Sequence, residues 1–234
     1  MKLTILVPVY NEENTITFVL NKLISLKLKC DKEVIVIDDG STDKTKSFIQ
    51  KIKKYNLKKI FHKQNLGKGE ALKSGIKKAT GSYILIQDAD LEYDPEEIPN
   101  LLKPIEKNKN TPSPKLLAIY GSRFKRKNVE IPPVYLFGNK LLTYITNLLF
   151  GVHLSDMETG FKLLPAAFLK KIKIKSSHFD FEPEITARLI KRKIPIIEVP
   201  ISYKGRSHVA GKKLTVMDAF GAIKALIYFR FLLQ

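Results

Sequence analysis

The sequence contains a single cysteine, Cys30, so one chain cannot form an internal disulfide. This excludes a disulfide-stapled secreted domain, and we expect a reducing, cytoplasmic compartment. The first ten residues, MKLTILVPVY, also lack the small-residue cleavage site of a secretory signal. Acidic residues are scarce, since 23 Asp and Glu are outnumbered by 41 Lys and Arg, and the formal net charge is +18.

This surplus of positive charge favours an anionic partner, such as a phosphorylated metabolite or an acidic membrane surface. A Lys-rich surface that only keeps the protein soluble would have the same composition. No nucleic-acid-binding motif accompanies the charge, so we do not expect a nucleic-acid partner.

Strand and helix patterns alternate over the first half of the chain. Residues 2–9 are a continuous apolar run, as expected for a strand covered on both faces. Residues 11–26 carry apolar side chains at helical spacing, and residues 32–40 repeat the strand pattern before a helix capped by Ser41 or Thr42. The alternation predicts an α/β fold, with a mostly parallel, Rossmann-like sheet flanked by helices.

Two acidic clusters follow predicted strands: Asp38 with Asp39, and Asp88 with Asp90. The carboxyl ends of parallel strands form the ligand-binding edge of such a sheet, so we expect the clusters to converge. Carboxylates held together repel one another unless a cation lies between them, and hard oxygen ligands suit Mg²⁺ or Mn²⁺. The alternative is a solvated loop before a helix, which is our interpretation of the following segment DPEEI, 94–98.

Five segments, in this order and spacing, resemble the family two glycosyltransferases with the GT-A fold: VPVYNEENTI, VIDDGSTDKT, NLGKGEALKSGIKKATGSYILIQDAD, YGSR and ETGFKLL. The resemblance extends from residue 3 to about residue 213 and implies one catalytic domain over 1–213. Within the family, residues 179–214 resemble the polyprenol-phosphate hexose synthases. The implied reaction is transfer of a hexose, with inversion, from a nucleotide diphosphate sugar to a polyprenyl phosphate.

The resemblance also implies roles for individual residues. The donor, a UDP- or GDP-hexose, is expected to contact Pro8, Tyr10, Glu12, Asp38, Asp39, Lys68 and Asp88. The ligands of Mg²⁺ or Mn²⁺ are expected to be Asp88, Asp90 and Glu92.

The remaining expected site residues would act on the diphosphate and the acceptor. Arg123 has the planar fork that suits two phosphate oxygens, and Arg206 and Lys212 are expected to close over phosphate from a loop. Lys162 is expected to bind the acceptor phosphate, and Asp156 to orient the sugar or the acceptor, or else to cap a helix. A phosphate monoester is already largely dianionic at neutral pH, so it needs no general base.

Two other functions would use similar residues. A transferase acting on a glycan or protein hydroxyl is one, but the chain has no Trp and so lacks the Q-x-x-R-W signature of polymerising relatives. A sugar-nucleotide pyrophosphorylase is the other, and it should carry a Gly-rich basic segment where this chain has PVYNEEN.

Two long apolar stretches, 134–150 and 214–234, are interrupted by polar or charged residues. Each charge at the centre of a membrane-spanning helix costs about 2.5–3.5 kcal/mol, so neither stretch is expected to cross a bilayer. Both could be amphipathic helices at the inner face of a membrane, or ordinary core helices. For 214–234 we expect interfacial binding, with Lys224 and Arg230 at the head groups and these side chains in lipid: Ile223, Leu226, Ile227 and Phe231.

Overall fold

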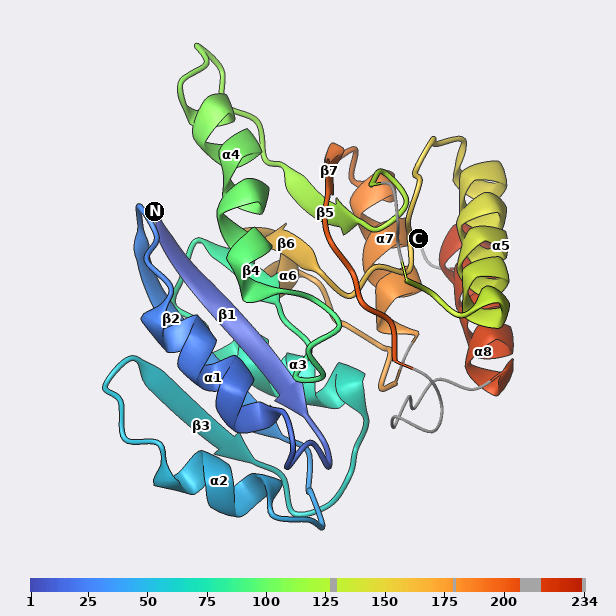
Figure 1. Cartoon of the computed structure of the whole chain (residues 1–234). Coiled ribbons are helices and arrows are strands. Elements are labelled where there is room, and N and C mark those ends of the chain that lie inside the picture. The colour runs from blue at the N-terminus through green and yellow to red at the C-terminus, as the bar shows by residue number, and fades with distance from the viewer. Residues whose placement is uncertain (127–129, 179, 207–215, 233–234) are drawn as a thin grey trace.

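The computed structural model describes residues 1–126, 130–178, 180–206 and 216–232. Its centre is a seven-stranded sheet in the order β3-β2-β1-β4-β6-β5-β7 (Figure 1). Neighbouring strands run parallel except for β6, which is antiparallel to both β4 and β5. The strands are β1 (Lys2–Val9), β2 (Asp31–Asp38), β3 (Leu57–Phe61), β4 (Tyr83–Ile86), β5 (Ala118–Ser122), β6 (Lys162–Pro165) and β7 (Ile196–Pro200).

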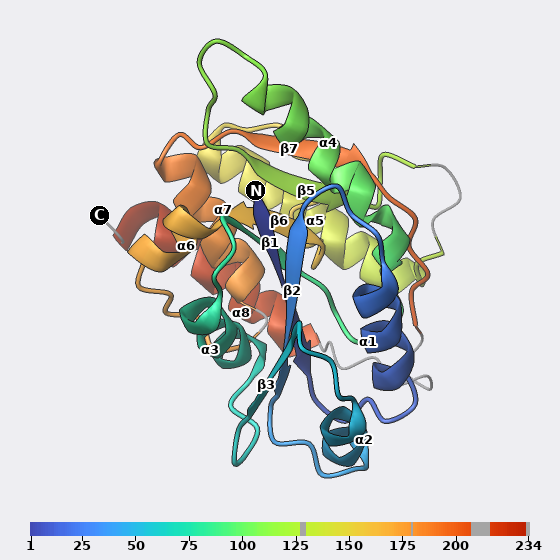
Figure 2. The ribbon, with the colours of Figure 1, turned by 90° about the vertical axis from the view of Figure 1, so that its left-hand side faces the viewer.

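Helices cover both faces of the sheet, which confirms the predicted α/β fold. Figure 2 shows α1, α2 and α4 on one side of strands β1 to β3, with α3 and α6 on the other. The helices are α1 (Ile16–Ser25), α2 (Thr45–Lys51), α3 (Lys68–Lys78), α4 (Ile98–Lys109), α5 (Pro133–Phe150), α6 (Ala166–Lys171), α7 (Phe181–Lys191) and α8 (Val216–Ile227). A 3₁₀ turn at Pro95–Glu97 precedes α4, and a π-helical turn at Tyr228–Leu232 follows α8.

The apolar run of β1 has this composition because the strand packs against both helix layers. Leu3, Ile5 and Val7 belong to the core under α1 and α4, whereas Leu6 belongs to the core under α3 and α7. Alternate side chains of a strand point to opposite faces, so a strand buried on both faces has to be apolar throughout.

The parallel strands bring the acidic segments to one edge of the sheet. Val9, at the end of β1, pairs with Asp38, at the end of β2. On the other side of β1, the backbone N–H of Gln87 donates to the carbonyl of Leu6, so the chain leaves β4 at the same edge. Residues about 50 positions apart in the sequence therefore lie at one edge, as the alternating pattern predicts.

The turn after β2 differs from the prediction. Neither Ser41 nor Thr42 caps α2, which begins at Thr45 without a side-chain cap at its preceding residue. Both hydroxyls contact Asn11: Ser41 Oγ accepts from the Asn11 backbone N–H at 2.9 Å, and Thr42 Oγ1 accepts from the Asn11 side chain at 3.2 Å. These contacts tie the turn after β2 to the turn after β1. The helix start predicted at 94–98 is confirmed, because Asp94 accepts from the Glu96 N–H at 2.9 Å and Pro95 opens the turn.

Helices α5 and α8 lie side by side at one end of the sheet (Figure 1) and share a small apolar core. Leu226 is fully buried there, packed in a cluster with Leu142 and Met157. Its predicted insertion into lipid is therefore wrong, since an amphipathic helix buries the side chains that face its neighbour. Ile227 and Phe231 remain 46% and 66% exposed. None of the helices in the described part of the chain is both long enough and apolar enough to cross a membrane.

Candidate active site

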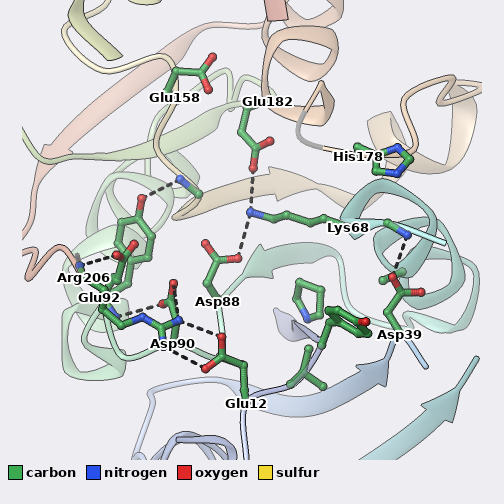
Figure 3. A pocket seen from close by; sticks show the side chains of 18 of the residues that line it. Glu12, Asp39, Lys68, Asp88, Asp90, Glu92, Glu158, His178, Glu182 and Arg206 are labelled. Atoms are coloured by element: carbon green, nitrogen blue, oxygen red, sulfur yellow. Dashed lines mark hydrogen bonds and ion pairs between the residues drawn. The ribbon is translucent and has the colours of Figure 1, made fainter. Parts of the chain in front are cut away.

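A cavity of about 350 Å³ opens where β1, β2 and β4 end, and α5 and α7 contribute to its wall. It brings together most of the residues expected to form the site (Figure 3). The expected residues that line it are Pro8, Tyr10, Glu12, Asp39, Lys68, Asp88, Asp90, Glu92, Arg123 and Arg206. Asp38, Asp156 and Lys162 do not line it, and Lys212 lies outside the described residues.

At one end of the cavity, Asp39 is held by donors from the loop before α3. Its carboxylate accepts from the backbone N–H groups of Leu66 and Gly67, the latter at 2.8 Å, and lies 2.6 Å from His62 Nδ1. Gly67 is needed in this loop because its φ is +97° and a Cβ would lie 2.3 Å from the carbonyl oxygen of Ser177. Asp39 is therefore an oriented carboxylate in the cavity wall.

The neighbouring residue Asp38 is oriented differently. It is 1% exposed and accepts from the Ser41 N–H at 3.1 Å, inside the turn rather than in the cavity. The prediction that both carboxylates contact a nucleotide therefore does not agree with the structure, because successive side chains at a strand end point to opposite faces. The contact of Asp39 with His62 was not foreseen from the sequence, where His62 falls within the short strand pattern KKIFHK; in the structure it follows the end of β3 at Phe61.

In the middle of the cavity, Lys68 bridges two acidic side chains. Its ammonium group lies 2.9 Å from Glu182 Oε1 and 3.0 Å from Asp88 Oδ1. Burial acts to lower the pKa of Lys68, but the two carboxylates outweigh burial and raise that pKa above its usual value. Lys68 is thus a permanent cation at the start of α3. Glu182 was missed by sequence reasoning, and its acidic segment FDFE at the start of α7 was the only available signal.

Opposite this bridge, Arg206 holds three acidic residues in place. Its guanidinium pairs with Glu12 at 2.9 Å and lies 3.4 Å from Asp90 Oδ2. Its backbone N–H donates to Glu92 at 2.7 Å, and the hydroxyl of Tyr203 donates to the other oxygen of Glu92 at 2.6 Å. The residue expected to close over phosphate is therefore, in this structure, the counter-ion of the acidic cluster.

Asp90 is the carboxylate of this cluster whose negative charge is least well neutralised by basic neighbours. Burial, followed by the charges of Asp88 and Glu92, raises the pKa of Asp90 to about 7, although Arg206 acts in the opposite direction. A divalent cation would remove this penalty, because it favours the ionised form of its ligand.

The acidic residues of this cluster could bind Mg²⁺ or Mn²⁺ only if water or substrate phosphates supplied the other ligands. Among the described residues, no three acidic, histidine or cysteine side chains are arranged to hold a metal by themselves. Mg²⁺ commonly uses one or two carboxylates and takes its other ligands from water and substrate phosphates. Asp90 fits that role, whereas Asp88 is paired with Lys68 and both oxygens of Glu92 already accept hydrogen bonds.

Arg123 follows the end of β5 and lines the cavity, and the buried carboxylate of Asp156 holds it in position. The guanidinium donates twice to this carboxylate, each time at 2.7 Å, and the backbone N–H of Arg123 donates a third bond at 2.9 Å. Burial opposes the charge, but Asp156 holds the pKa of Arg123 well above its usual value. Asp156 is completely buried, so its predicted direct contact with sugar or acceptor does not agree with the structure. It positions Arg123 instead.

Lys162 is also completely buried, and it does not line the cavity. Its ammonium group donates to the carbonyl oxygens of Met157 and Thr159 and lies 4.3 Å from the centre of the Tyr120 ring. Its expected contact with an acceptor phosphate does not agree with this position. Burial lowers the pKa of Lys162 to about 8, against the opposing effect of nearby carboxylates.

The fold and the site together define a GT-A-fold glycosyltransferase. Residues 4–173 match the family model described as glycosyl transferase family 2. The chain belongs to this family.

Two curated relatives carry the same functional name. The chain is 30% identical to a dolichyl-phosphate beta-glucosyltransferase of Saccharomyces cerevisiae, over 97% of this chain and 74% of the relative. It is 31% identical to a dolichyl-phosphate beta-glucosyltransferase of Dictyostelium discoideum, over 91% of this chain and 68% of the relative. An uncharacterised protein of Methanocaldococcus jannaschii is 29% identical, over 97% of this chain and 98% of its own length.

Solved structures of a glucosyl-3-phosphoglycerate synthase from Mycobacterium tuberculosis share the fold. The complex of that synthase with uridine diphosphate superposes with a TM-score of 0.71 at 18% identity, covering 97% of this chain and 78% of that one. Its complex with Mn²⁺, UDP-glucose and phosphoglyceric acid gives a TM-score of 0.72 at 18% identity, covering 97% and 79%. At this level of identity the likeness shows the fold alone.

The position of Asp90 predicts a pH-dependent metal affinity. Protons compete with the metal for a carboxylate whose pKa is about 7, so Mn²⁺ affinity in the presence of UDP should fall several-fold between pH 8 and pH 6. Asp90→Asn should weaken Mn²⁺ binding at least about tenfold and remove most of this pH dependence. Calorimetric titration with Mn²⁺ at the two pH values measures both effects.

Asp94→Asn is the matched control. Asp94 follows the same strand but pairs with Lys22, and it does not line the cavity. This variant should keep the affinity and the pH dependence of the wild type. Unchanged Mn²⁺ affinity in Asp90→Asn would remove Asp90 from the metal site.

Proposed function

We propose that this protein is an inverting, metal-dependent hexosyltransferase that moves a hexose from UDP- or GDP-hexose to a polyprenyl phosphate at the inner face of a membrane. The observation that carries the proposal is the order of charges in one cavity. In Figure 3, Asp39 lies on one side, Lys68 and Asp88 lie between, and Asp90 lies with Arg206 on the other side. Arg123 brings a further cation to the same cavity.

The donor would lie along this series of groups. The base and ribose would lie between Tyr10 and the oriented carboxylate of Asp39, and the diphosphate beside Asp90, since all three residues line the cavity. When bound there, a divalent cation would supply positive charge to the leaving diphosphate. A solved structure of the M. tuberculosis synthase contains Mn²⁺ with UDP-glucose, which supports this class of donor and cofactor.

Arg123 would stabilise the charge that develops as the diphosphate leaves. Its three bonds with Asp156 fix the guanidinium before substrate binds, so little reorganisation is needed during the reaction. Arg206 would move from Glu12 and Asp90 to the diphosphate once the metal supplies their positive charge. Glu12, which also accepts from the Thr15 hydroxyl at 3.0 Å, would contact the ribose hydroxyls.

A lipid phosphate is the acceptor most consistent with the chain and its relatives. A phosphate monoester attacks without a general base, because it is already ionised at neutral pH. Asp156 is occupied by Arg123 and cannot serve as that base from its buried position. Two relatives at about 30% identity are dolichyl-phosphate beta-glucosyltransferases, which supports the same acceptor class here.

An apolar stripe on α5 supports contact with the membrane where such an acceptor resides. Side chains at helical spacing on one face of α5 are exposed to between 41% and 72%: Val134, Phe137, Leu141, Tyr144 and Leu148. Tyr135 and Asn139, in the N-terminal half of the same helix, line the cavity. With 3.6 residues per turn they lie on the face of α5 opposite the stripe. In the proposed arrangement, the stripe would contact lipid while the phosphate of a polyprenyl phosphate enters the cavity on the other side of this helix.

Helix α8 and the turn after it carry a second set of exposed apolar side chains. Phe220, Ile227 and Phe231 are exposed to between 46% and 66%, and the exposed Lys224 and Arg230 lie among them. Apolar side chains with basic neighbours bind acidic bilayer surfaces through hydrophobic burial and charge together.

The proposed reaction can be tested directly with purified protein. UDP- and GDP-hexoses, offered with Mn²⁺ and a polyprenyl phosphate, should give a polyprenyl phosphohexose with β linkage from an α-linked donor. EDTA should abolish the transfer and added Mn²⁺ should restore it. Mass spectrometry detects the product, and NMR of the anomeric centre gives its configuration.

The same assay should include a phosphoglycerate and a glycan as competing acceptors. Transfer to either of these, with none to polyprenyl phosphate, would refute the proposed acceptor. An α-linked lipid product would refute the single displacement.

The stripe on α5 can be tested separately from the chemistry. Phe137→Ser with Leu148→Ser removes two exposed apolar side chains, so the folded protein should bind anionic vesicles at least about tenfold more weakly. Transfer to a long polyprenyl phosphate in vesicles should fall, whereas transfer to a short, water-soluble analogue should not. Vesicle sedimentation and the two transfer rates measure this difference.

Tyr55→Ser with Leu116→Ser is the matched control, because both side chains are exposed and lie outside α5 and α8. This pair should bind vesicles as the wild type does. If the α5 variant binds vesicles as tightly as the control, the stripe is not the membrane-binding surface.

A further inference from the structure

The cavity wall contains one carboxyl group that forms no ion pair with a basic side chain of the described residues, although the charges of Lys162 and Arg123 act on it. Lys68 bridges Asp88 and Glu182, and Arg123 is paired with Asp156. The third buried cation of this layer, Lys162, donates its hydrogen bonds to backbone carbonyls. Four carboxyl groups therefore share the layer with three cations, and the fourth carboxyl is that of Glu158.

Glu158 lines the cavity, and its Oε1 atom is buried without a hydrogen-bond partner among the described residues. A buried polar atom left unsatisfied costs free energy, so native proteins rarely keep one without a function. Burial, followed by the charge of Glu182, raises the pKa of Glu158 to about 8. At neutral pH the group is then mostly a carboxylic acid, which can both donate and accept a hydrogen bond.

The position of Glu158 indicates which part of a ligand it would meet. In Figure 3, Glu158 lies beyond the Lys68–Glu182 pair, on the side away from Glu12 and well removed from Asp39. The same segment approaches the diphosphate region, because a Cβ on Gly160 would lie 2.4 Å from Asp88 Oδ2. A donor with its base near Asp39 and its diphosphate near Asp90 has only its sugar ring left to fill this space.

We propose that Glu158 is a specificity-determining residue whose carboxyl group binds a ring hydroxyl of the hexose carried by the donor. The inference rests on the proposed use of the cavity for a nucleotide-hexose, and it is independent of the acceptor. A hydroxyl both donates and accepts, so it satisfies a neutral carboxyl group without adding charge to the layer. A ring lacking that hydroxyl, or carrying it on the other face, would leave Oε1 unsatisfied, and such a site discriminates strongly against the wrong sugar.

If Glu158 binds the hexose, its substitution should weaken binding of the nucleotide-hexose but not binding of the nucleoside diphosphate. Glu158→Leu removes the hydrogen-bonding group, so it should bind the nucleotide-hexose about tenfold or more weakly than wild type while binding the nucleoside diphosphate within about twofold. Glu158→Gln, whose amide can still donate and accept, should retain most of the hexose affinity. Calorimetry with Mn²⁺, comparing UDP with UDP-hexose and GDP with GDP-hexose, gives both constants without any acceptor.

The affinity for the nucleoside diphosphate also reports folding, because a misfolded variant would lose both ligands. Glu106→Leu is the control for the same substitution at an exposed position on α4, outside the cavity, and both its affinities should match wild type. A role for Glu158 in structure alone would weaken the two ligands equally. That result, or equal ratios in wild type and Glu158→Leu, would overturn the inference.

Deoxygenated donors identify the hydroxyl. For one ring position, the deoxy donor should bind wild type about tenfold more weakly than the parent donor, and Glu158→Leu should show no further loss. Equal losses in wild type and variant at every ring position would also overturn the inference. If wild type binds no nucleotide-hexose, the proposed donor class and this inference are both wrong. If it binds one and Glu158→Leu keeps the wild-type ratio, only this inference is wrong.

Discussion

The site depends on one constraint: basic side chains have to neutralise the acidic side chains that gather at one edge of the sheet. Parallel strands β1, β2 and β4 end together, and each is followed by carboxylates. Carboxylates in a cavity destabilise one another unless cations lie between them. Lys68 and Arg206 supply this charge beside Asp88 and Asp90, and each is itself held by another acid, Glu182 or Glu12. The acidic edge and the basic side chains over it are one electrostatic unit.

This arrangement prepares the cavity for an anionic ligand with its own cation. Lys68 and Arg123 are held in position by carboxylates before a ligand binds, which is the condition under which electrostatic stabilisation costs least during a reaction. Asp156 shows the same principle, because a completely buried carboxylate holds Arg123 at the cavity wall. Asp90 remains the exception, with a pKa raised to about 7, and it is the position where a metal would restore balance.

Much of the fold follows from the sequence because it depends on local patterns. The apolar run 2–9 and the strand before Asp38 predict a sheet covered on both faces, and the acidic strand ends predict where a ligand binds. Local patterns did not predict how deeply each charged side chain is buried. Asp156 lies in the polar segment SDMET, and Lys162 is a charged residue at the start of the otherwise apolar β6, yet both are completely buried.

The partners of the site residues were the least predictable feature. Lys68 and Glu182 are 114 residues apart, and the pairs of Arg206 with Glu12 and of His62 with Asp39 also join distant segments. The contacts of Glu182 and Arg206 depend on how α7 and the chain after β7 return to the sheet, and the contact of His62 depends on the pairing of β3 with β2; no local pattern specifies either. Leu226 shows the corresponding limit for helices, because amphipathicity defines an apolar face but not whether protein or lipid covers it.

Diffraction from crystals grown with Mn²⁺ and a UDP- or GDP-hexose is the most direct test of the proposed metal and donor site, because the anomalous signal locates the metal independently of the protein coordinates. We expect one Mn²⁺ peak between the donor diphosphate and the carboxylate of Asp90, with the guanidinium of Arg206 displaced from Asp90 toward phosphate. A donor bound in the cavity with no metal at Asp90, or a metal and donor bound elsewhere on the protein, would contradict this expectation.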